Sequence, residues 1–113
     1  MLVNWVRIEA FIDKSSEEDL LWLKTSIADL IQNLDGKRKQ INSLMANSDY
    51  SLIQPILHQI KGVAANFGLE DFCNVAREAE TLLKENQIKE FLSIMDRLST
   101  LWESTKSELE TRL

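Results

Sequence analysis

The residue in this sequence whose chemistry stands out is His58, because the chain contains no second histidine. A single histidine excludes metal sites and proton relays built on histidine pairs. The single cysteine, Cys73, likewise excludes an internal disulfide or a cysteine-based metal cage, and so favours a reducing compartment. An imidazole can nevertheless act as a nucleophile by itself. What His58 can do then depends on whether it is buried or presented to a partner.

The neighbours of His58 predict that it faces outward. At about 100° per residue, the apolar residues of this segment gather on one side of a helix and His58 falls on the other side. These apolar residues are Ile53, Ile56, Leu57, Ile60, Ala64 and Phe67. Lys61 and Gly62 lie beside His58 on its own surface, and Ala65 lies two turns along the same strip.

Small residues beside an exposed histidine indicate that space is kept open. A glycine inside a helix costs about 1 kcal/mol relative to alanine, so Gly62 is a poor choice for surface that is merely solvated. An open approach lets a partner bring a reactive group to His58, and Lys61 can neutralise a phosphoryl group placed on the ring. The alternative interpretation is that His58 and Lys61 are ordinary solvated residues.

The elements that must position these residues are helices, because the apolar spacing is helical throughout and no stretch alternates strictly. We expect one domain over residues 1–113, an all-α antiparallel up-down four-helix bundle with an additional short N-terminal helix. The predicted helices cover Val3–Ile12, a long segment from Glu17 to about Met45, Ser51–Phe67, Glu70 to about Glu85, and Ile88 towards Leu113.

Local signals predict how these helices begin and end. Ser15 or Ser16 can cap the long helix, and Ser51 with Gln54 forms a capping box for the next one. Gly68 is expected in a left-handed conformation that ends the third helix, with Leu69 folding back onto it. The first helix should carry an apolar stripe of Val3, Val6, Ile8, Phe11 and Ile12. The long helix should continue through Gly36, where a kink is the alternative, and Lys37, Arg38 and Lys39 should be solvated. Trp22 and Trp102 should lie in the core or at its boundary.

Composition argues against several partner classes. The net charge is −5 and the densest basic run is Lys37–Lys39, which disfavours binding to a phosphate backbone. No apolar run approaches the roughly 20 residues of a membrane span, and the N-terminus lacks the pattern of a secretion signal. We therefore expect a soluble, cytoplasmic monomer that contacts neither nucleic acid nor membrane.

The segment His58-Gln59-Ile60-Lys61-Gly62-Val63-Ala64-Ala65-Asn66-Phe67-Gly68 resembles the signature of histidine-containing phosphotransfer (HPt) domains. That signature reads His, any residue, an aliphatic residue, Lys-Gly, small residues, then an apolar residue and Gly. The departure is Val63, where the family usually has Ala or Ser. The expected five helices and the chain length also fit the family.

The resemblance implies a role for each site residue. His58 would accept a phosphoryl group on Nε2 from a receiver-domain aspartate and return it to another receiver. Lys61 would steady the phosphoryl oxygens, and Gly62 would keep the approach open. Glu80 matches the position where the family places a Glu or Gln that accepts a hydrogen bond from the imidazole, although a simple surface charge is the alternative. Arg77 could add charge near the phosphate, but solvation is the better interpretation.

The resemblance also implies a phosphoryl carrier in a multistep two-component relay rather than an autonomous kinase, and no nucleotide-binding loop is present. Its partners would be response-regulator receiver domains and a hybrid sensor histidine kinase. The protein would need no cofactor of its own, because the receiver's carboxylates would supply Mg²⁺. Two alternatives stay open: a non-catalytic helical adaptor that binds signalling proteins, and a helical fragment that packs in a larger assembly.

Overall fold

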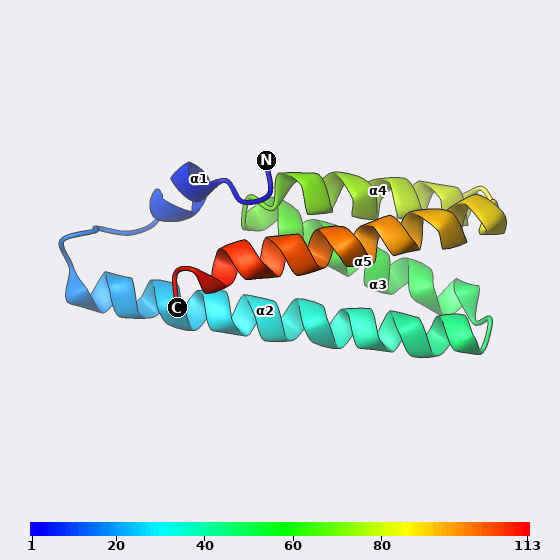
Figure 1. Cartoon of the computed structure of the whole chain (residues 1–113), viewed down its shortest axis with the longest axis horizontal. Coiled ribbons are helices and arrows are strands. Elements are labelled where there is room, and N and C mark those ends of the chain that lie inside the picture. The colour runs from blue at the N-terminus through cyan, green and yellow to red at the C-terminus, as the bar shows by residue number, and fades with distance from the viewer.

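The computed structural model describes all 113 residues and contains five helices and no strand, which confirms the all-α prediction. The helices are α1 (Trp5–Glu9), α2 (Glu17–Ala46), α3 (Tyr50–Asn66), α4 (Glu70–Lys84) and α5 (Ile88–Glu110). In Figure 1, α2 runs the length of the molecule and α3, α4 and α5 lie alongside it, while α1 sits at one end. None of the helices combines the length and the hydropathy that a membrane span requires.

The long helix α2 is continuous through Gly36, as the unbroken phase of its apolar stripe predicts. It begins where Ser16 accepts a hydrogen bond from the backbone N–H of Asp19, 3.2 Å away, which confirms the predicted serine cap. Thirty residues of α-helix span about 45 Å, which accounts for most of the 49 Å long axis of the molecule.

The capping box predicted at Ser51 is wrong. Helix α3 begins one residue earlier, at Tyr50, and Asp49 occupies the N-cap without a side-chain hydrogen bond. The reason lies in the preceding turn: Ser48 adopts a left-handed φ of 57° and Asp49 N–H donates to the carbonyl of Leu44 at 2.9 Å. This backbone motif closes α2 so tightly that Ser51 already falls inside the first turn of α3.

Helix α1 is shorter than predicted, and only part of its apolar stripe is buried. Val3 and Ile8 are buried, whereas Val6 and Phe11 are 81% and 70% exposed. A helix that ends at Glu9 is too short to bury a long stripe. Val3 is buried for another reason: the extended N-terminal segment pairs with the α3–α4 turn, where Asn4 N–H donates to the carbonyl of Gly68 at 2.8 Å.

The α3–α4 turn follows the sequence signal closely. Gly68 has a φ of +68°, Leu69 is fully buried, and Leu69 N–H donates to the carbonyl of Ala64 at 2.9 Å. A Cβ on Gly68 would also lie only 3.0 Å from the Cβ of Asn4. The glycine therefore serves both the left-handed turn and the close approach of the N-terminal segment.

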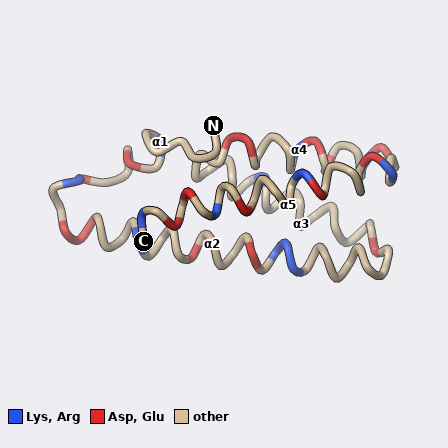
Figure 2. Tube along the Cα trace, viewed as in Figure 1, with Lys and Arg blue, Asp and Glu red and all other residues tan.

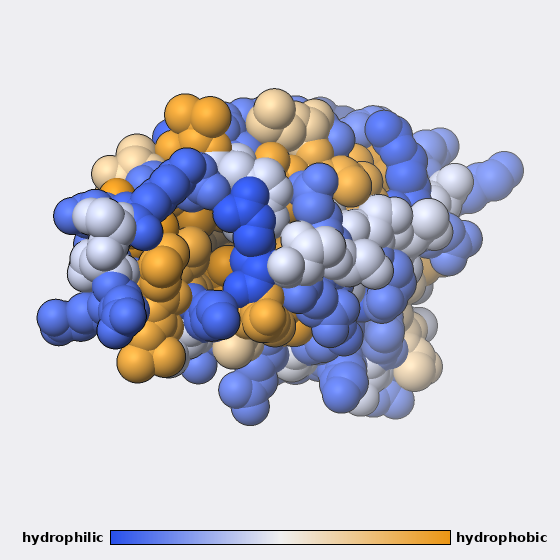
Figure 3. Space-filling model, turned by 60° about the vertical axis from the view of Figure 1, so that its left-hand side comes forward, coloured by the Kyte–Doolittle hydropathy of each residue, from blue (hydrophilic) through white to orange (hydrophobic).

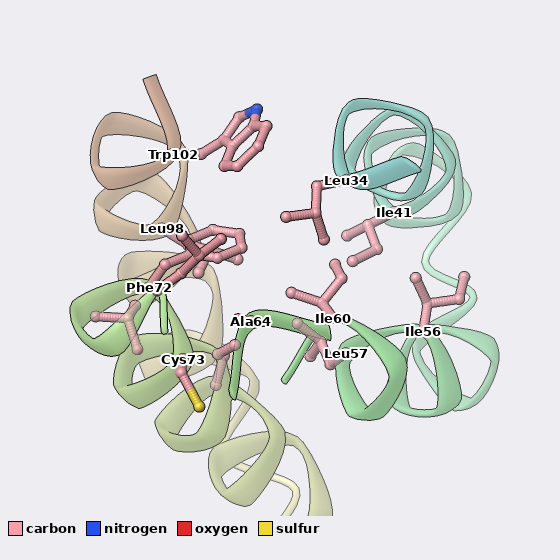
Figure 4. Close-up of a cluster of buried hydrophobic side chains, with 14 of the residues drawn as sticks. Leu34, Ile41, Ile56, Leu57, Ile60, Ala64, Phe72, Cys73, Leu98 and Trp102 are labelled. Carbon is pink, nitrogen blue, oxygen red and sulfur yellow. The ribbon is translucent and has the colours of Figure 1, made fainter. Parts of the chain in front are cut away.

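The core forms where α2, α3, α4 and α5 meet, and Figure 4 shows Leu34, Ile60, Phe72 and Trp102 converging from these four helices. Trp102 is fully buried, and its indole N–H donates to Asp35 Oδ1 at 2.7 Å. Core packing is thus confirmed for Trp102, one of the two tryptophans predicted to lie in the core or at its boundary.

Two surface predictions on α2 need comment. The core or boundary position predicted for Trp22 is wrong: its side chain is exposed at 52%, because Leu23 and Ile27 take the buried side of α2. The expectation that the Lys37–Lys39 run is solvated is wrong for Arg38, whose side chain is only 15% exposed and lies 3.6 Å from Glu103 of α5. Arg38 is only four residues from the buried Leu34 and so lies on the edge of α2 that adjoins α5.

Candidate functional site

His58 lies midway along α3, and its side chain is 67% exposed. The opposite side of the helix holds Ile53, Leu57, Ile60 and Ala64, all with no exposed surface, so packing fixes the rotation of α3 and turns His58 outward. The outward position predicted from the helical wheel is what the structure shows.

Glu80 of α4 reaches His58 across the α3–α4 interface. It is 3% exposed, and its Oε2 lies 3.1 Å from Nδ1 of His58. A carboxylate can only accept hydrogen bonds, so this contact places the imidazole proton on Nδ1 and leaves the Nε2 lone pair free. Ala76 and Ala79, both fully buried on the same helix, keep the interface side of α4 small. Glu80 is therefore a buried group, and the orienting role implied for it stays a prediction.

Lys61 binds Glu80 rather than standing free in solvent. Its Nζ lies 2.8 Å from Oε1 of Glu80, and its side chain is only 25% exposed. The two oxygens of one carboxylate thus hold the imidazole and the lysine that follows it by one turn. This geometry links Lys61 and His58 through a shared buried anion, an arrangement that the sequence pattern did not reveal.

A second lysine near the carboxylate was missed by sequence reasoning. Lys84 Nζ lies 3.9 Å from Oε2 of Glu80, and the i, i+4 spacing on one helix was the available signal. Burial by itself would raise the pKa of Glu80, but the hydrogen bond and charge of Lys61, followed by the charge of Lys84 and the hydrogen bond of His58, hold that pKa below its ordinary value. The carboxylate is therefore ionised around neutral pH.

Gly62 leaves open space beside His58. It is exposed, and a Cβ built on it would meet no atom within 4 Å. Nothing within the molecule requires a glycine there, because α3 is regular at this position. Packing inside the molecule therefore does not explain the glycine, and the access role implied for Gly62 stays a prediction.

The remaining predicted residue, Arg77, lies on the surface of α4. Its guanidinium donates to Asn74 Oδ1 at 3.1 Å and approaches the sulfur of Cys73 at 3.9 Å. These contacts stay within α4, in agreement with the interpretation of Arg77 as a solvated residue. No group of three or more His, Cys, Asp or Glu side chains is arranged to hold a metal ion.

The arrangement as a whole presents one nucleophile. The His58 side chain is exposed, Glu80 contacts its Nδ1 and so leaves Nε2 without a partner in the molecule, and the Lys61 ammonium lies on the same carboxylate. Because phosphoryl transfer depends mainly on positioning and charge neutralisation, such a site can accept a phosphoryl group that a partner brings in line with Nε2.

Comparison with known proteins agrees with this geometry. The Hpt domain family matches residues 22–108, which include the whole of α3 and α4 and most of α2 and α5. No curated protein and no solved structure matches the chain. Hpt domains are helical bundles that act in histidine phosphotransfer of two-component systems. Because the match extends over most of the sequence and contains the His58 signature, the chain belongs to the Hpt domain family.

Proposed function

We propose that this protein is an intermediate of a multistep phosphorelay, which accepts a phosphoryl group on His58 from the aspartate of one receiver domain and passes it to the aspartate of another. The observation that carries this proposal is the contact between Nδ1 of the exposed His58 and the buried Glu80. A surface histidine with no function has no need of a buried carboxylate behind it, since burying a charge is costly.

The transfer step follows from the atoms present. The lone pair of Nε2 attacks the phosphorus of the aspartyl phosphate, a P–N bond forms, and the P–O bond to the aspartate breaks as its carboxylate leaves. The reverse attack by a carboxylate oxygen of the next receiver regenerates neutral His58. Phosphohistidine and aspartyl phosphate are both high-energy species, so the step is reversible.

Each neighbour of His58 has a part in this step. Glu80 keeps the proton on Nδ1, so that Nε2 stays nucleophilic, and Lys61 provides charge for the phosphoryl oxygens from its position 2.8 Å from Glu80. Gly62 leaves room for the receiver, because no side chain projects beside the ring.

The expected partners are response-regulator receiver domains and a hybrid sensor histidine kinase. In this proposal the receiver's own carboxylates hold the Mg²⁺ used in transfer. We also propose that the protein acts as a cytoplasmic monomer and as a carrier, with no kinase activity of its own.

The test is a phosphotransfer profile of the chain against the phosphorylated receiver domains of its source organism, with His58→Gln as the control. We expect acid-labile, alkali-stable phosphate on the wild type and none on the variant. Full labelling of His58→Gln would refute the assignment. Failure of every receiver and kinase to label the wild type, with partner affinity unchanged by His58→Gln, would instead favour the helical adaptor.

A further inference from the structure

Two lysines share the buried carboxylate of Glu80. Nζ of Lys61 lies 2.8 Å from Oε1, and Nζ of Lys84 lies 3.9 Å from Oε2, close to the longest distance of an ion pair. The side chain of Glu80 is buried, that of Lys61 is partly buried and that of Lys84 is half exposed. Neither lysine forms an ion pair with any other residue. The site therefore holds one more lysine than this single carboxylate requires.

The grooves beside α3 supply no further cation. Lys61 is the only Asp, Glu, Lys or Arg residue of α3, which Figure 2 shows as an almost uncharged helix. An apolar groove lies where α1 meets α2, and Figure 3 shows apolar side chains around a hollow at this end of the molecule. Phe11, Trp22 and Phe67 are among the residues that line it, and none of its lining residues is charged. A shallower groove between α2 and α3 contains Asp29 but no lysine or arginine.

A phosphoryl group on His58 would change the balance of charge at this site. It brings up to about two negative charges to Nε2, whereas Glu80 contacts Nδ1 on the other side of the ring. Lys61 follows His58 by one helical turn, and its flexible stem lets the ammonium turn towards the phosphoryl oxygens. Glu80 is buried and stays on Nδ1–H, so it cannot follow Lys61. One lysine cannot neutralise both anions, and a buried carboxylate without a cation is costly.

We propose that Lys84 is a positioning residue for phosphotransfer, which replaces Lys61 on Glu80 when Lys61 turns to the phosphoryl group on His58. The inference rests on the proposed function and assigns Lys84 a role without contact with the phosphoryl group. The i, i+4 spacing keeps Lys84 on the same side of α4 as Glu80, and its Nζ needs to move only about 1 Å to form a hydrogen bond with the carboxylate. No other ion pair of Lys84 has to break.

Chemical modification of the lysine amines tests this exchange without a partner protein. Phosphoramidate, a small phosphoryl donor, labels His58 when Nε2 attacks its phosphorus, the P–N bond of the donor breaks and ammonia leaves. Trace acetylation by acetic anhydride is then read for each lysine by mass spectrometry, with the exposed Lys89 as the reference. An amine held on a carboxylate stays protonated and reacts slowly. Relative to Lys89, Lys84 should react about threefold or more slowly after phosphorylation.

The variant Lys61→Gln separates exchange on Glu80 from direct contact with the phosphoryl group. Without Lys61, Lys84 should bind Glu80 before any phosphorylation, so its acetylation should be slow from the outset and phosphorylation should not change it. Direct contact predicts the opposite, fast acetylation that slows only after phosphorylation. Wild-type reactivity of Lys84 in unphosphorylated Lys61→Gln would overturn the inference. This measurement needs no phosphoryl group, so it decides the inference even if the variant is labelled poorly.

The rate of labelling by phosphoramidate supplies the functional readout. Lys84→Gln should be labelled about threefold or more slowly than the wild type, and the matched control Lys89→Gln at the wild-type rate. In the Lys61→Gln background, replacing Lys84 should cause no further loss, because no lysine remains to be released from Glu80. The same further loss in the double variant would show that Lys84 acts on the phosphoryl group itself and would overturn the exchange. Lys84 is exposed, so its replacement leaves the core intact.

The outcomes keep this inference distinct from the proposed function. If receivers label the wild type but Lys84 reacts alike before and after phosphorylation, the lysine exchange is overturned and the proposed function stands. If Lys84 becomes protected after labelling by phosphoramidate but no receiver or kinase labels the wild type, the relay fails and the lysine exchange stands.

Discussion

Replacing Gly62 should raise stability and impair phosphotransfer at the same time. Gly62 is exposed within a regular helix, and an added Cβ would meet no atom within 4 Å. Gly62→Ala therefore has no steric cost and gains the difference in helix propensity, about 1 kcal/mol. For a domain of this size that gain raises Tm by about 4–6 °C.

A larger side chain at the same position should block the partner. Gly62→Gln places an extended side chain beside His58, one turn along the helix, in the space through which a receiver must approach. Crowding a packed contact costs about 1–3 kcal/mol, which corresponds to transfer about five- to 150-fold slower. Labelling by phosphoramidate should change little, because so small a donor needs less space.

Gly36 provides the matched control. It also lies inside a helix, it is exposed, and a Cβ there meets no atom within 4 Å. Gly36→Ala should gain the same stability and leave transfer unchanged. The measurements are thermal unfolding by circular dichroism and transfer from one phosphorylated receiver. Destabilisation by Gly62→Ala, or transfer at the wild-type rate in Gly62→Gln, would refute the reasoning that this glycine serves access.

Three further changes test the structure. Gly68→Ala should destabilise by about 1–2 kcal/mol through its left-handed φ of +68°, and faster amide exchange in the N-terminal segment should accompany the loss; an unchanged urea midpoint would contradict the placement. Trp102→Phe should lower the free energy of unfolding by about 1–3 kcal/mol, because it removes the indole donor of Asp35 and leaves a gap in the core. A decrease of less than about 0.5 kcal/mol would contradict this. The pKa of Glu80 is lower in the folded state than its ordinary value of 4.5, so the ionised carboxylate stabilises the fold above about pH 4.5, and this stabilisation is lost as the pH falls through the folded-state pKa. The free energy of unfolding of the wild type should therefore fall relative to that of Glu80→Gln between about pH 7 and pH 3. A difference that does not change with pH would contradict this.

The helices and their rotation were predictable from the sequence because they depend on local spacing. The phase of Ile53, Leu57 and Ile60 placed His58 outward, and burial in the structure agrees. The turn at Gly68 was also predictable, since a left-handed backbone conformation favours glycine whatever the surrounding fold. The start of α3 was predicted wrongly because two local signals competed, and the turn at Ser48 prevailed over the capping box at Ser51.

Contacts between helices were harder to predict from the sequence. The arrangement of Glu80 was expected from the family resemblance, but its bond to Lys61, the proximity of Lys84 and the groove under Phe11 were not. These features depend on how far one helix slides and rotates against another. Periodicity carries no information on that register, because many registers bury the same apolar stripe.

The sequence by itself determined an all-α chain with one exposed nucleophile, because hydrophobic period and side-chain chemistry are properties of single segments. Only the tertiary structure decided that one buried carboxylate from α4 holds both His58 and Lys61. It also decided that Phe11, Trp22 and Phe67, which are distant in sequence, line one apolar groove where α1 meets α2. Both depend on side chains that are distant in sequence and meet only when the packed core sets the positions of the helices.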